Sequence, residues 1–457
     1  MKHLCCLAII AIGALGCRVQ ADNATFTNPI ITAIYTADPS AHVWADGRLY
    51  VYASHDMDPP RGCDLMDRYH VFSTDDLVHW TDHGEILRSS DVEWGRKEGG
   101  FMWAPDCAYK NGTYYFYFPH PSETKWNDSW KIGVATSKNP ASGFKSQGYI
   151  QGLGGFALID PCIFVDDDGQ AYIYIGGGSK CVGAKLKPNM TELDGEVQLM
   201  TGLEDFHEAT WVFKRNGLYY LTYADNHQNE KKKGANRMRY AISKNPLGPW
   251  EYKGVYLDPQ SSDTSHGSLV EFKGQWYQFY HCADISGRGN LRSVCVDKVE
   301  FNDDGTIKPI AQTRPATLTA TPAPKATAET VKYEAETATL SGSATVNEAP
   351  GASGGKSVQN LHLADASLQF NKVDGKDGGM ATISVYFAAE KTTKLRLIVN
   401  DEDWSFINAI ATGGWNNYTG CTFLTVPLKP GKTNTVKLAG EKGNGINVDY
   451  ITVTPLR

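Results

Sequence analysis

Five segments of the chain share one alternating pattern of aromatic, aliphatic and polar residues. Asn-Gly and Asp-Gly supply the positive φ angles of tight hairpins, and alternation of this kind is typical of half-buried strands. The segments are DGRLYVYASH from Asp46, NGTYYFYFPH from Asn111, DGQAYIYIGG from Asp168, NGLYYLTYAD from Asn216 and, more loosely, KGQWYQFYHC from Lys273. Their turn glycines are 48 to 65 residues apart, and a strand repeat of this kind predicts a β-propeller with one blade per copy. We therefore expect five blades.

The repeats occupy residues 22–310, which we assign to the propeller. Residues 311–330 are rich in Ala, Thr and Pro and predict a semi-extended linker. Residues 331–457 contain several short apolar strands, which predict a β-sandwich of the jelly-roll kind. The predicted fold class is thus all-β, a five-bladed β-propeller followed by a β-sandwich.

The charge pattern argues against nucleic acid as a partner. The 457-residue chain has a net charge of −7, and its one basic cluster, residues 231–233, is most simply a solvated loop. Aromatic residues beside carboxylates and amides suit a neutral, polyhydroxylated ligand better than a phosphorylated one.

Residues 1–21 have the features of a secretory signal. A basic start precedes the apolar run LCCLAIIAIGALG, and Ala21 ends a cleavage pattern. A rival interpretation is a lipoprotein box in which Cys17 carries lipid. Both predict an exported protein, either periplasmic or secreted, or an outer-membrane lipoprotein anchored through Cys17.

Seven cysteines remain after residue 21, so at least one thiol is unpaired if the protein is exported. Cys282 and Cys295 are spaced to bridge a hairpin, and no Cys/His pattern has the spacing of a zinc site.

Three carboxylates lie just before, or at the start of, the first strand of a predicted blade: Asp38, Asp160 and Glu208. The inner strands of a propeller converge on its axis, so these side chains are expected to meet. A buried carboxylate is unfavourable unless it is paired or functional. Glycoside hydrolysis needs one protonated and one ionised carboxyl group, and a third acid nearby raises the pKa of the proton donor. The alternative for each residue taken singly is a turn cap.

The phrases YTADPSAH, MWAPD, IDPCIF, HEATWVFKRNGLYYLTYA and SHGSLVEF, in this order, resemble those of glycoside hydrolase family 43. The resemblance implies a five-bladed propeller of inverting enzymes. It makes Asp38 the general base, Glu208 the general acid and Asp160 the residue that tunes the acid. Inversion requires carboxyl groups roughly 6.5–9.5 Å apart.

The same resemblance suggests further pocket residues in the propeller. Trp103 matches an aromatic that lines the sugar pocket, with a core aromatic as the alternative. His266 matches a histidine that binds a central Ca²⁺ or other cation, mostly through water, although a lone histidine is often a core residue. Arg292 matches a sugar-contacting arginine, with a surface arginine as the alternative. His207 is expected to point to the other face of its strand, away from Glu208.

The C-terminal phrases YEAE, TGGWNNYT and INVDYITV resemble carbohydrate-binding module family 6. The resemblance implies a structural Ca²⁺ held by Glu334, Glu336 and Asp449, and a sugar cleft containing Trp415 and Asn447. It leaves Trp404 and Tyr418 without an assigned place. The alternative is a sandwich that only packs against the propeller.

These features together predict an exported, exo-acting, inverting glycosidase. Its expected partner is plant cell-wall polysaccharide such as arabinoxylan or arabinan, from which it releases α-L-arabinofuranosyl or β-D-xylosyl residues. Inserts at residues 57–68 and 225–236 are candidates for the pocket walls. A galactan- or galactofuranose-cleaving enzyme and a non-catalytic, glycan-binding propeller remain as alternatives. No organic cofactor is expected, and no membrane contact unless Cys17 is lipidated.

Overall fold

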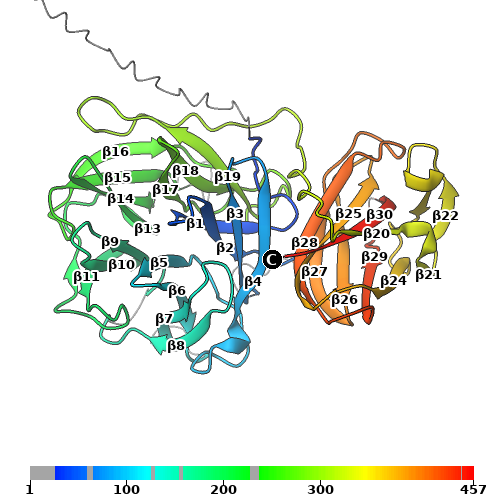
Figure 1. Cartoon of the computed structure of the whole chain (residues 1–457). Coiled ribbons are helices and arrows are strands. Elements are labelled where there is room, and N and C mark those ends of the chain that lie inside the picture. The colour runs from blue at the N-terminus through cyan, green and yellow to red at the C-terminus, as the bar shows by residue number, and fades with distance from the viewer. Residues whose placement is uncertain are drawn as a thin grey trace, which may run out of the picture.

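The computed structural model of the chain is built almost entirely from β-strands (Figure 1). It describes residues 26–58, 65–124, 129–153, 158–226, 236–443 and 445–456. The predicted signal, including Cys17 and Ala21, lies outside these residues. Among the described residues, no helix is long and apolar enough to cross a membrane.

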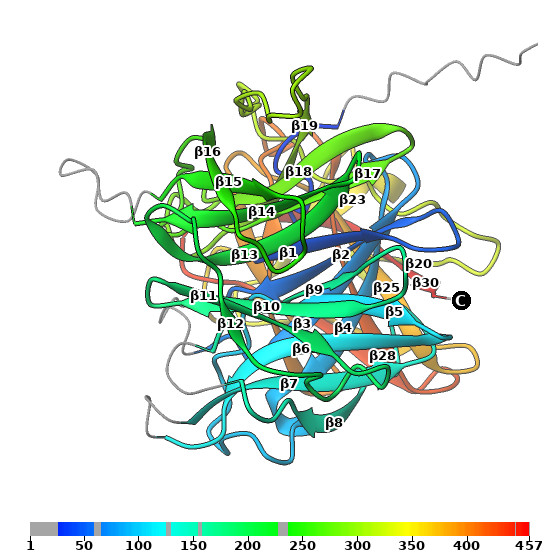
Figure 2. The ribbon, with the colours of Figure 1, turned by 90° about the vertical axis from the view of Figure 1, so that its left-hand side faces the viewer.

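Five antiparallel sheets form the propeller, and each is one blade (Figure 2). The first blade contains β1 (Thr36–Val43), β2 (Leu49–His55), β3 (Arg68–Thr74) and β4 (Trp80–Arg88), followed by the 3₁₀ turn η1 (Ser89–Asp91). The second contains β5 (Asp106–Lys110), β6 (Thr113–Pro121), β7 (Trp130–Ser137) and β8 (Lys145–Tyr149). The third contains β9 (Cys162–Val165), β10 (Ala171–Gly177), β11 (Lys180–Leu186) and β12 (Gln198–Leu199). The fourth contains β13 (Phe206–Arg215), β14 (Leu218–Asp225), β15 (Met238–Ser243) and β16 (Glu251–Leu257), and the fifth contains β17 (Ser268–Phe272), β18 (Gln275–Cys282) and β19 (Ser293–Val299).

The repeated sequence phrase is the second strand of every blade: β2, β6, β10, β14 and β18. The five turn glycines that precede these strands all have φ between 75° and 82°, as a tight hairpin requires. Aromatic residues of these strands pack between neighbouring blades, as Tyr52 of β2 does against Phe116 of β6. The alternating sequence pattern therefore reflects which face of each strand is buried. The prediction of five blades is confirmed.

The first described residues close the ring of blades. The Ile30 amide donates to the carbonyl of Val294 at 2.8 Å, and the Thr36 amide donates to that of Arg292 at 2.8 Å. The Asn28 side chain exchanges hydrogen bonds with the amide and carbonyl of Val296, both at 2.8 Å. The segment before β1 therefore runs along β19 and covers the outer edge of the three-stranded fifth blade.

The C-terminal domain is a β-sandwich of two sheets. One sheet has the order β22-β23-β30-β25-β28, with β20 paired to β30, and the other has the order β21-β24-β29-β26-β27. Its strands are β20 (Val331–Glu334), β21 (Thr339–Ser341), β22 (Thr345–Glu348), β23 (Lys356–Gln359), β24 (Ser367–Val373), β25 (Gly379–Ala388), β26 (Thr393–Val399), β27 (Glu402–Ala409), β28 (Gly420–Leu428), β29 (Asn434–Ala439) and β30 (Asn447–Pro455). Two 3₁₀ turns, η2 (Ala335–Thr337) and η3 (Ser353–Gly355), complete it.

The predicted linker, residues 311–330, has no strand and lies against the propeller. Thr313 Oγ1 donates to Asp297 at 2.6 Å, and the buried Thr321 shares hydrogen bonds with Thr32 and donates to the carbonyl of Ile30. The threonine hydroxyls thus hold the linker against the surface of the propeller. The composition of the linker predicts an extended chain but not this attachment.

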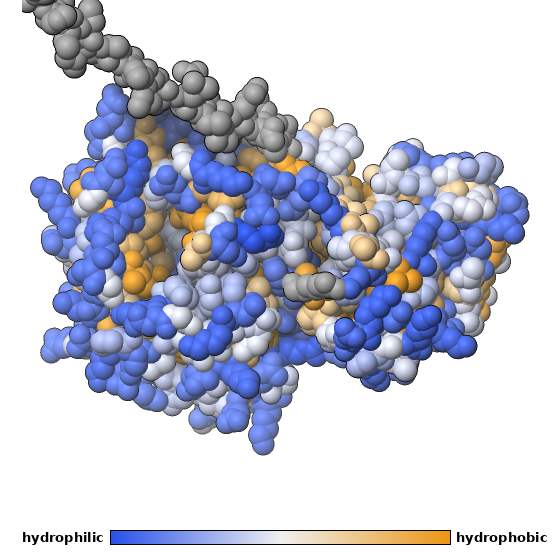
Figure 3. Space-filling model, viewed as in Figure 1, coloured by the Kyte–Doolittle hydropathy of each residue, from blue (hydrophilic) through white to orange (hydrophobic). Residues whose placement is uncertain are grey.

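The two domains pack directly against each other, with β4 beside β25 and β28 (Figure 1). The Thr425 amide and hydroxyl donate to Asp82, both at 2.7 Å, and the Asn408 amide donates to the carbonyl of Ala33 at 2.7 Å. The guanidinium of Arg88 lies over the ring of the buried Trp404, which is thereby placed in the interface. Buried apolar side chains of the first and fifth blades are continuous with the sandwich core. Figure 3 shows that hydrophilic residues cover most of the outer surface in this view, whereas hydrophobic residues gather in a hollow of the propeller domain.

Candidate active site

A pocket of about 260 Å³ brings together the three predicted carboxylates. Asp38, Asp160 and Glu208 come from three different blades, and Trp103, His266 and Arg292 line the same pocket. The remaining lining residues are Met66, Ala104, Ile159, Asp263, Thr264, Gly289 and Asn290.

Local backbone distortions aim the carboxylates into this pocket. Asp38 and Asp160 have φ of 50° and 52°, and Ala209, next to Glu208, has φ of 65°. The pairing of β1 shifts between Ala37 and Ser40, and that of β13 shifts on both sides of Glu208. Non-glycine residues in the left-handed region and bulges inside a strand are both unfavourable, and they are typical of functional sites. Without these shifts in pairing, the side chains of Asp38 in β1 and Glu208 in β13 would point to the faces of their sheets.

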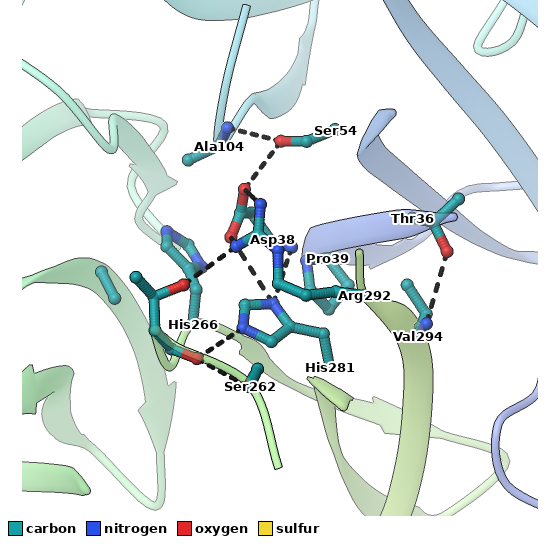
Figure 4. Close-up of polar contacts among 12 residues, drawn as sticks. Thr36, Asp38, Pro39, Ser54, Ala104, Ser262, His266, His281, Arg292 and Val294 are labelled. Atoms are coloured by element: carbon teal, nitrogen blue, oxygen red, sulfur yellow. Dashed lines mark hydrogen bonds and ion pairs between the residues drawn. The ribbon is translucent and has the colours of Figure 1, made fainter. Parts of the chain in front are cut away.

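Asp38 lies among hydrogen-bond donors that favour its ionised form, and Figure 4 shows these contacts. Its Oδ1 accepts from Arg292 Nη1 at 2.9 Å, and its Oδ2 accepts from Ser54 Oγ at 2.8 Å. Burial opposes ionisation, but the charge of Arg292, the neighbouring histidines and the Ser54 hydrogen bond outweigh it, and the pKa of Asp38 falls to about 2.

Arg292 is itself fixed by a second acid, Asp56. Asp56 accepts from the Arg292 amide, Nε and Nη2 at 2.8 to 2.9 Å, so the guanidinium bridges two buried carboxylates. The planar, multidentate guanidinium is suited to this role in a way that a lysine ammonium is not.

His281 supports Asp38 as a neutral ring. Its Nδ1 accepts from the Asp38 amide at 3.1 Å, and its Nε2 lies 2.8 Å from the Thr264 carbonyl, which places the proton on Nε2. Burial, followed by the charge of Arg292, lowers the pKa of His281 to about 3.

Glu208 and Asp160 lie in an environment that favours protonation. Burial and the charge of Glu208 raise the pKa of Asp160 well above its usual range. Burial raises the pKa of Glu208, with a further contribution from Asp38, although His207 and Arg292 oppose it. Asp160 Oδ2 accepts from the Ala209 amide at 2.7 Å, which secures the bulge that carries Glu208. One carboxylate held ionised and a coupled pair that retains a proton are the two states that glycoside hydrolysis needs.

His207 does not point away from the acid, contrary to the expectation from strand alternation. Its Nε2 lies 3.6 Å from Glu208 Oε2. The shift in pairing between Phe206 and Glu208 breaks the two-residue alternation and brings both side chains to the same region.

Trp103 and His266 form part of the pocket wall. The Trp103 ring packs on Trp130 with centroids 4.6 Å apart, so it serves both the core and the pocket. His266 Nε2 lies 3.8 Å from Asp160 Oδ2, and neither ring nitrogen has a hydrogen-bond partner among the described residues. Burial lowers the pKa of His266 to about 4, so the imidazole is neutral and its unprotonated nitrogen can accept a hydrogen bond or bind a cation.

The two predicted inserts are described only in part. Met66, from the insert at residues 57–68, lines the pocket, but residues 59–64 lie outside the described part of the chain. Residues 227–235 of the second insert also lie outside it.

The predicted sugar-cleft residues of the C-terminal domain lie side by side. The Trp415 side chain is 39% exposed, and Asn447 Nδ2 donates to the Trp415 carbonyl at 3.0 Å. The amide nitrogen of Asn447 therefore anchors the loop of Trp415, which leaves the aromatic face as the stronger candidate for sugar contact. The Tyr418 hydroxyl is engaged by Ser357 at 2.7 Å.

The predicted calcium ligands of this domain lie near one another at one end of β20 and β30. Asp449 and Glu334 are linked through Ser353, whose amide and hydroxyl donate to them at 2.9 and 3.0 Å. Glu334 and Glu336 each retain a buried oxygen without a partner in the described structure. Across the described residues, no three His, Cys, Asp or Glu side chains converge closely enough to hold a metal ion by themselves.

Six cysteines lie among the described residues, and all are buried free thiols. The Cys282 and Cys295 sulfurs are 3.1 Å apart on neighbouring strands. The hairpin bridge that their spacing predicts is therefore not formed in this structure.

Asp56 and His281 were not predicted from the sequence, although the repeat contains a signal for them. The repeated phrase ends in a polar residue in three of its five copies, at His55, His120 and Asp225, and in the fifth copy His281 is the last residue but one. Asp56 directly follows the first copy. These positions interrupt an otherwise apolar pattern where the second strand of a blade approaches the pocket end of the propeller.

Comparison with known proteins identifies the family of each domain. The family model for glycosyl hydrolases family 43 matches residues 26–307, and that for carbohydrate binding module (family 35) matches residues 340–453. A xylosidase/arabinosidase 43A of Humicola insolens is 36% identical over 338 residues, which cover 61% of this chain and 98% of the relative.

Solved structures agree with this assignment. A β-xylosidase/α-arabinofuranosidase from a compost microbial metagenome, in complex with xylotriose, is 35% identical, with a TM-score of 0.56. The match covers 63% of this chain and 97% of that structure. An arabinoxylan arabinofuranohydrolase from Bacillus subtilis is 24% identical with a TM-score of 0.52, and the match covers 94% of this chain and 98% of that one. The latter likeness supports the fold of both domains.

The assignment of the C-terminal domain to carbohydrate-binding module family 6 is wrong, because family 35 is the one that matches. The phrase YEAE spans the end of β20 and the start of η2, the phrase INVDYITV forms most of β30, and β20 pairs with β30. Such paired strands constrain the sandwich fold, whereas families differ chiefly in the loops that carry binding residues.

The family 43 match spans more than half of the chain, and its residues include all three carboxylates of the pocket. On this evidence the chain belongs to glycosyl hydrolases family 43 and is a glycoside hydrolase.

Proposed function

We propose that the enzyme is an exo-acting, inverting glycosidase that releases α-L-arabinofuranosyl or β-D-xylosyl residues from plant polysaccharide such as arabinoxylan or arabinan. The observation that carries the proposal is the electrostatic contrast within one pocket, between an ionised Asp38 and the proton-retaining pair Glu208 and Asp160. The choice of arabinofuranosyl and xylosyl residues follows the names of similar proteins, a xylosidase/arabinosidase and a β-xylosidase/α-arabinofuranosidase.

In this mechanism Asp38 takes a proton from a water molecule as that water attacks the anomeric carbon. Glu208 donates its proton to the leaving oxygen as the glycosidic bond breaks. Arg292 and Ser54 keep Asp38 ionised and oriented. Burial and the charge of Asp38 raise the pKa of Glu208, and Asp160 holds the bulge that carries Glu208 through its hydrogen bond from the Ala209 amide.

The size of the pocket supports exo action on a single sugar. At about 260 Å³ it lies below the ~300–1,000 Å³ of typical small-molecule sites. A cavity this small suits one pentose unit at a chain end.

The first experiment measures p-nitrophenol release from the α-L-arabinofuranoside, the β-D-xyloside and the β-D-galactofuranoside. Wild type is compared with Asp38→Asn and Glu208→Gln. We expect Asp38→Asn to lose at least about 10²-fold in kcat on every active substrate, because the base is needed whatever the leaving group.

Glu208→Gln separates the acid role from general damage. A nitrophenolate leaves without protonation, so this variant is expected to lose far more activity on arabinoxylan oligosaccharides than on aryl glycosides. An equal loss on both would contradict the acid assignment. The anomer that first appears in an NMR time course reports the stereochemistry, and retention would contradict the inverting mechanism.

The C-terminal domain is proposed to bind plant glycan through the exposed ring of Trp415. Aromatic rings bind sugar faces, and this one is among the few large apolar side chains with substantial exposure. Trp415→Ala is expected to weaken retention on insoluble arabinoxylan, whereas Leu363→Ala, at an equally exposed position of the same domain, is not. Unchanged retention in Trp415→Ala would refute this role.

Calcium is proposed as a structural ion of the C-terminal domain. The unpartnered buried oxygens of Glu334 and Glu336, together with Asp449, are hard ligands of the kind that Ca²⁺ prefers, with backbone carbonyls or water to complete the shell. At the centre of the propeller, His266 offers a single nitrogen, which suits only a largely hydrated cation. Chelator treatment is expected to lower the melting temperature of wild type and to leave Glu336→Gln unchanged.

Export is proposed from the N-terminal residues. The mass of the mature protein distinguishes cleavage after Ala21 from lipidation of Cys17. Retention of residues 1–21 in the mature protein would contradict both.

A further inference from the structure

One ion pair joins the C-terminal domain to a propeller segment close in sequence to Asp56, which supports the active site. Lys394 on β26 lies with its Nζ 2.6 Å from Asp58 Oδ2, and Asp58 belongs to the propeller. The Asp58 side chain is only 4% exposed, whereas that of Lys394 is 26% exposed. A buried carboxylate needs a charged partner, so Lys394 satisfies a requirement of the propeller rather than of its own domain.

Asp58 connects Lys394 to the loop that builds one wall of the pocket. Arg288 Nη2 contacts the same Asp58 oxygen at 3.3 Å, but the Arg288 side chain is 47% exposed and therefore a weaker partner. The next two residues, Gly289 and Asn290, line the pocket, and the Gly289 carbonyl accepts from the Asp263 amide at 2.9 Å.

The same segment also supports the catalytic base. Asp56, two residues before Asp58, binds Arg292, which binds Asp38. The Asp56 amide donates to the carbonyl of Tyr35, just before β1. The segment from Asp56 to Asp58 thus lies between the strand of Asp38 and the loop of Arg288 and Arg292.

We propose that Lys394 is a positioning residue for the active site: its ion pair with Asp58 holds the 56–58 segment against the 283–292 loop. The C-terminal domain is then part of the structure that shapes the sugar pocket, in addition to any glycan it binds. This inference rests on the proposed glycosidase function for its kinetic readout but not for its structural one.

The interface offers a matched control. Arg88 and Glu402 form a second ion pair across the same domain boundary, 2.9 Å apart, and neither residue lines the pocket or contacts Asp58. Lys394→Met and Glu402→Gln therefore each remove one inter-domain charge pair, but only the first affects the pocket loop.

The test uses the full chain and compares Lys394→Met, Lys394→Arg, Asp58→Asn and Glu402→Gln with wild type. We expect Lys394→Met to raise KM for the active aryl glycoside about fivefold with kcat changed less than about twofold. Lys394 acts through Asp58 and Arg288 on the pocket-lining Gly289 and Asn290, whereas Arg292 keeps its own hydrogen bonds to Asp56. Lys394→Arg is expected to restore the wild-type value, and Glu402→Gln to retain it. Asp58→Asn removes the same ion pair through its propeller residue and is expected to raise KM to the same extent. Agreement between the two variants would show that the effect does not come from a folding defect of one of them.

Hydrogen exchange supplies a readout that does not need activity. Peptides covering residues 283–292 are expected to exchange faster in Lys394→Met than in wild type or Glu402→Gln. Equal exchange and equal KM in Lys394→Met and Glu402→Gln would overturn the proposal. Faster exchange in a protein inactive on every glycoside would sustain the positioning role and refute the proposed glycosidase activity instead.

Discussion

At the scale of single residues, the pocket combines groups that function requires and stability does not. Asp160 is 4% exposed, and burial together with the charge of Glu208 raises its pKa. A carboxyl group whose pKa is higher in the folded than in the unfolded state binds more protons when folded. Its contribution to stability is therefore lost as pH rises above its unfolded value near 4.

This argument predicts that Asp160→Asn is more stable than wild type at pH 8 and no more stable at pH 4. An asparagine oxygen can still accept from the Ala209 amide, but the side chain carries no charge. The expected rise in melting temperature at pH 8 is about 2 °C or more, accompanied by a loss of activity. A lower melting temperature at pH 8 would show that the ionised carboxylate is stabilising.

Arg292 offers a second test at this scale. Arg292→Lys keeps the positive charge but loses the fork that spans Asp38 and Asp56. The pKa of Asp38, now about 2, is expected to rise toward its usual value. Because the base must be ionised, the acidic limb of the profile of kcat/KM against pH should move to higher pH. An unchanged acidic limb would contradict the role of Arg292.

At the scale of elements, β3 and β4 carry a buried charged group, of which Asp82 also accepts a hydrogen bond from the Thr425 amide of the sandwich. His70 is 1% exposed, and its ring nitrogens lie 3.6 Å from Asp82 and 3.8 Å from Glu85. Burial opposes protonation, but the two carboxylates dominate and raise the pKa of His70 to about 8. The contribution of protonated His70 to the free energy of unfolding is fully present below about pH 6.5 and is lost as pH rises through 8.

We therefore expect the difference in unfolding free energy between wild type and His70→Gln to shrink by about 2 kcal/mol from pH 6 to pH 9. Denaturant titrations across this range measure it. His79→Gln, at a half-exposed histidine paired with Asp76, serves as the control. A difference that stays constant with pH would mean that His70 is neutral when folded.

The elements also show which features a sequence can predict. The second strand of each blade was predictable because its turn glycine and its alternation are local properties. The three carboxylates were predictable because they interrupt that pattern at equivalent places. The position of His207 was not, since the bulge in β13 depends on Asp160, 49 residues away along the chain. Asp58 and Lys394 are 336 residues apart, and nothing local to either marks the other as its partner.

At the scale of the whole molecule, the two domains share one apolar core and several buried hydrogen bonds. A docked interface of this kind couples the stability of the two parts. We expect a single calorimetric unfolding transition whose van't Hoff enthalpy matches the measured enthalpy. Two separated transitions would mean that the domains unfold independently.

The closure of the ring by residues 28–36 also constrains how the chain is made. Asn28 pairs with Val296, 268 residues later. The first propeller residues to leave the ribosome therefore cannot form their native hydrogen bonds until nearly the whole propeller has been synthesised. Contacts between such distant parts of a chain form late and slowly. During synthesis the earlier blades are exposed with an uncovered edge, and a nascent chain paused before residue 293 is the form of this enzyme most open to aggregation and proteolysis.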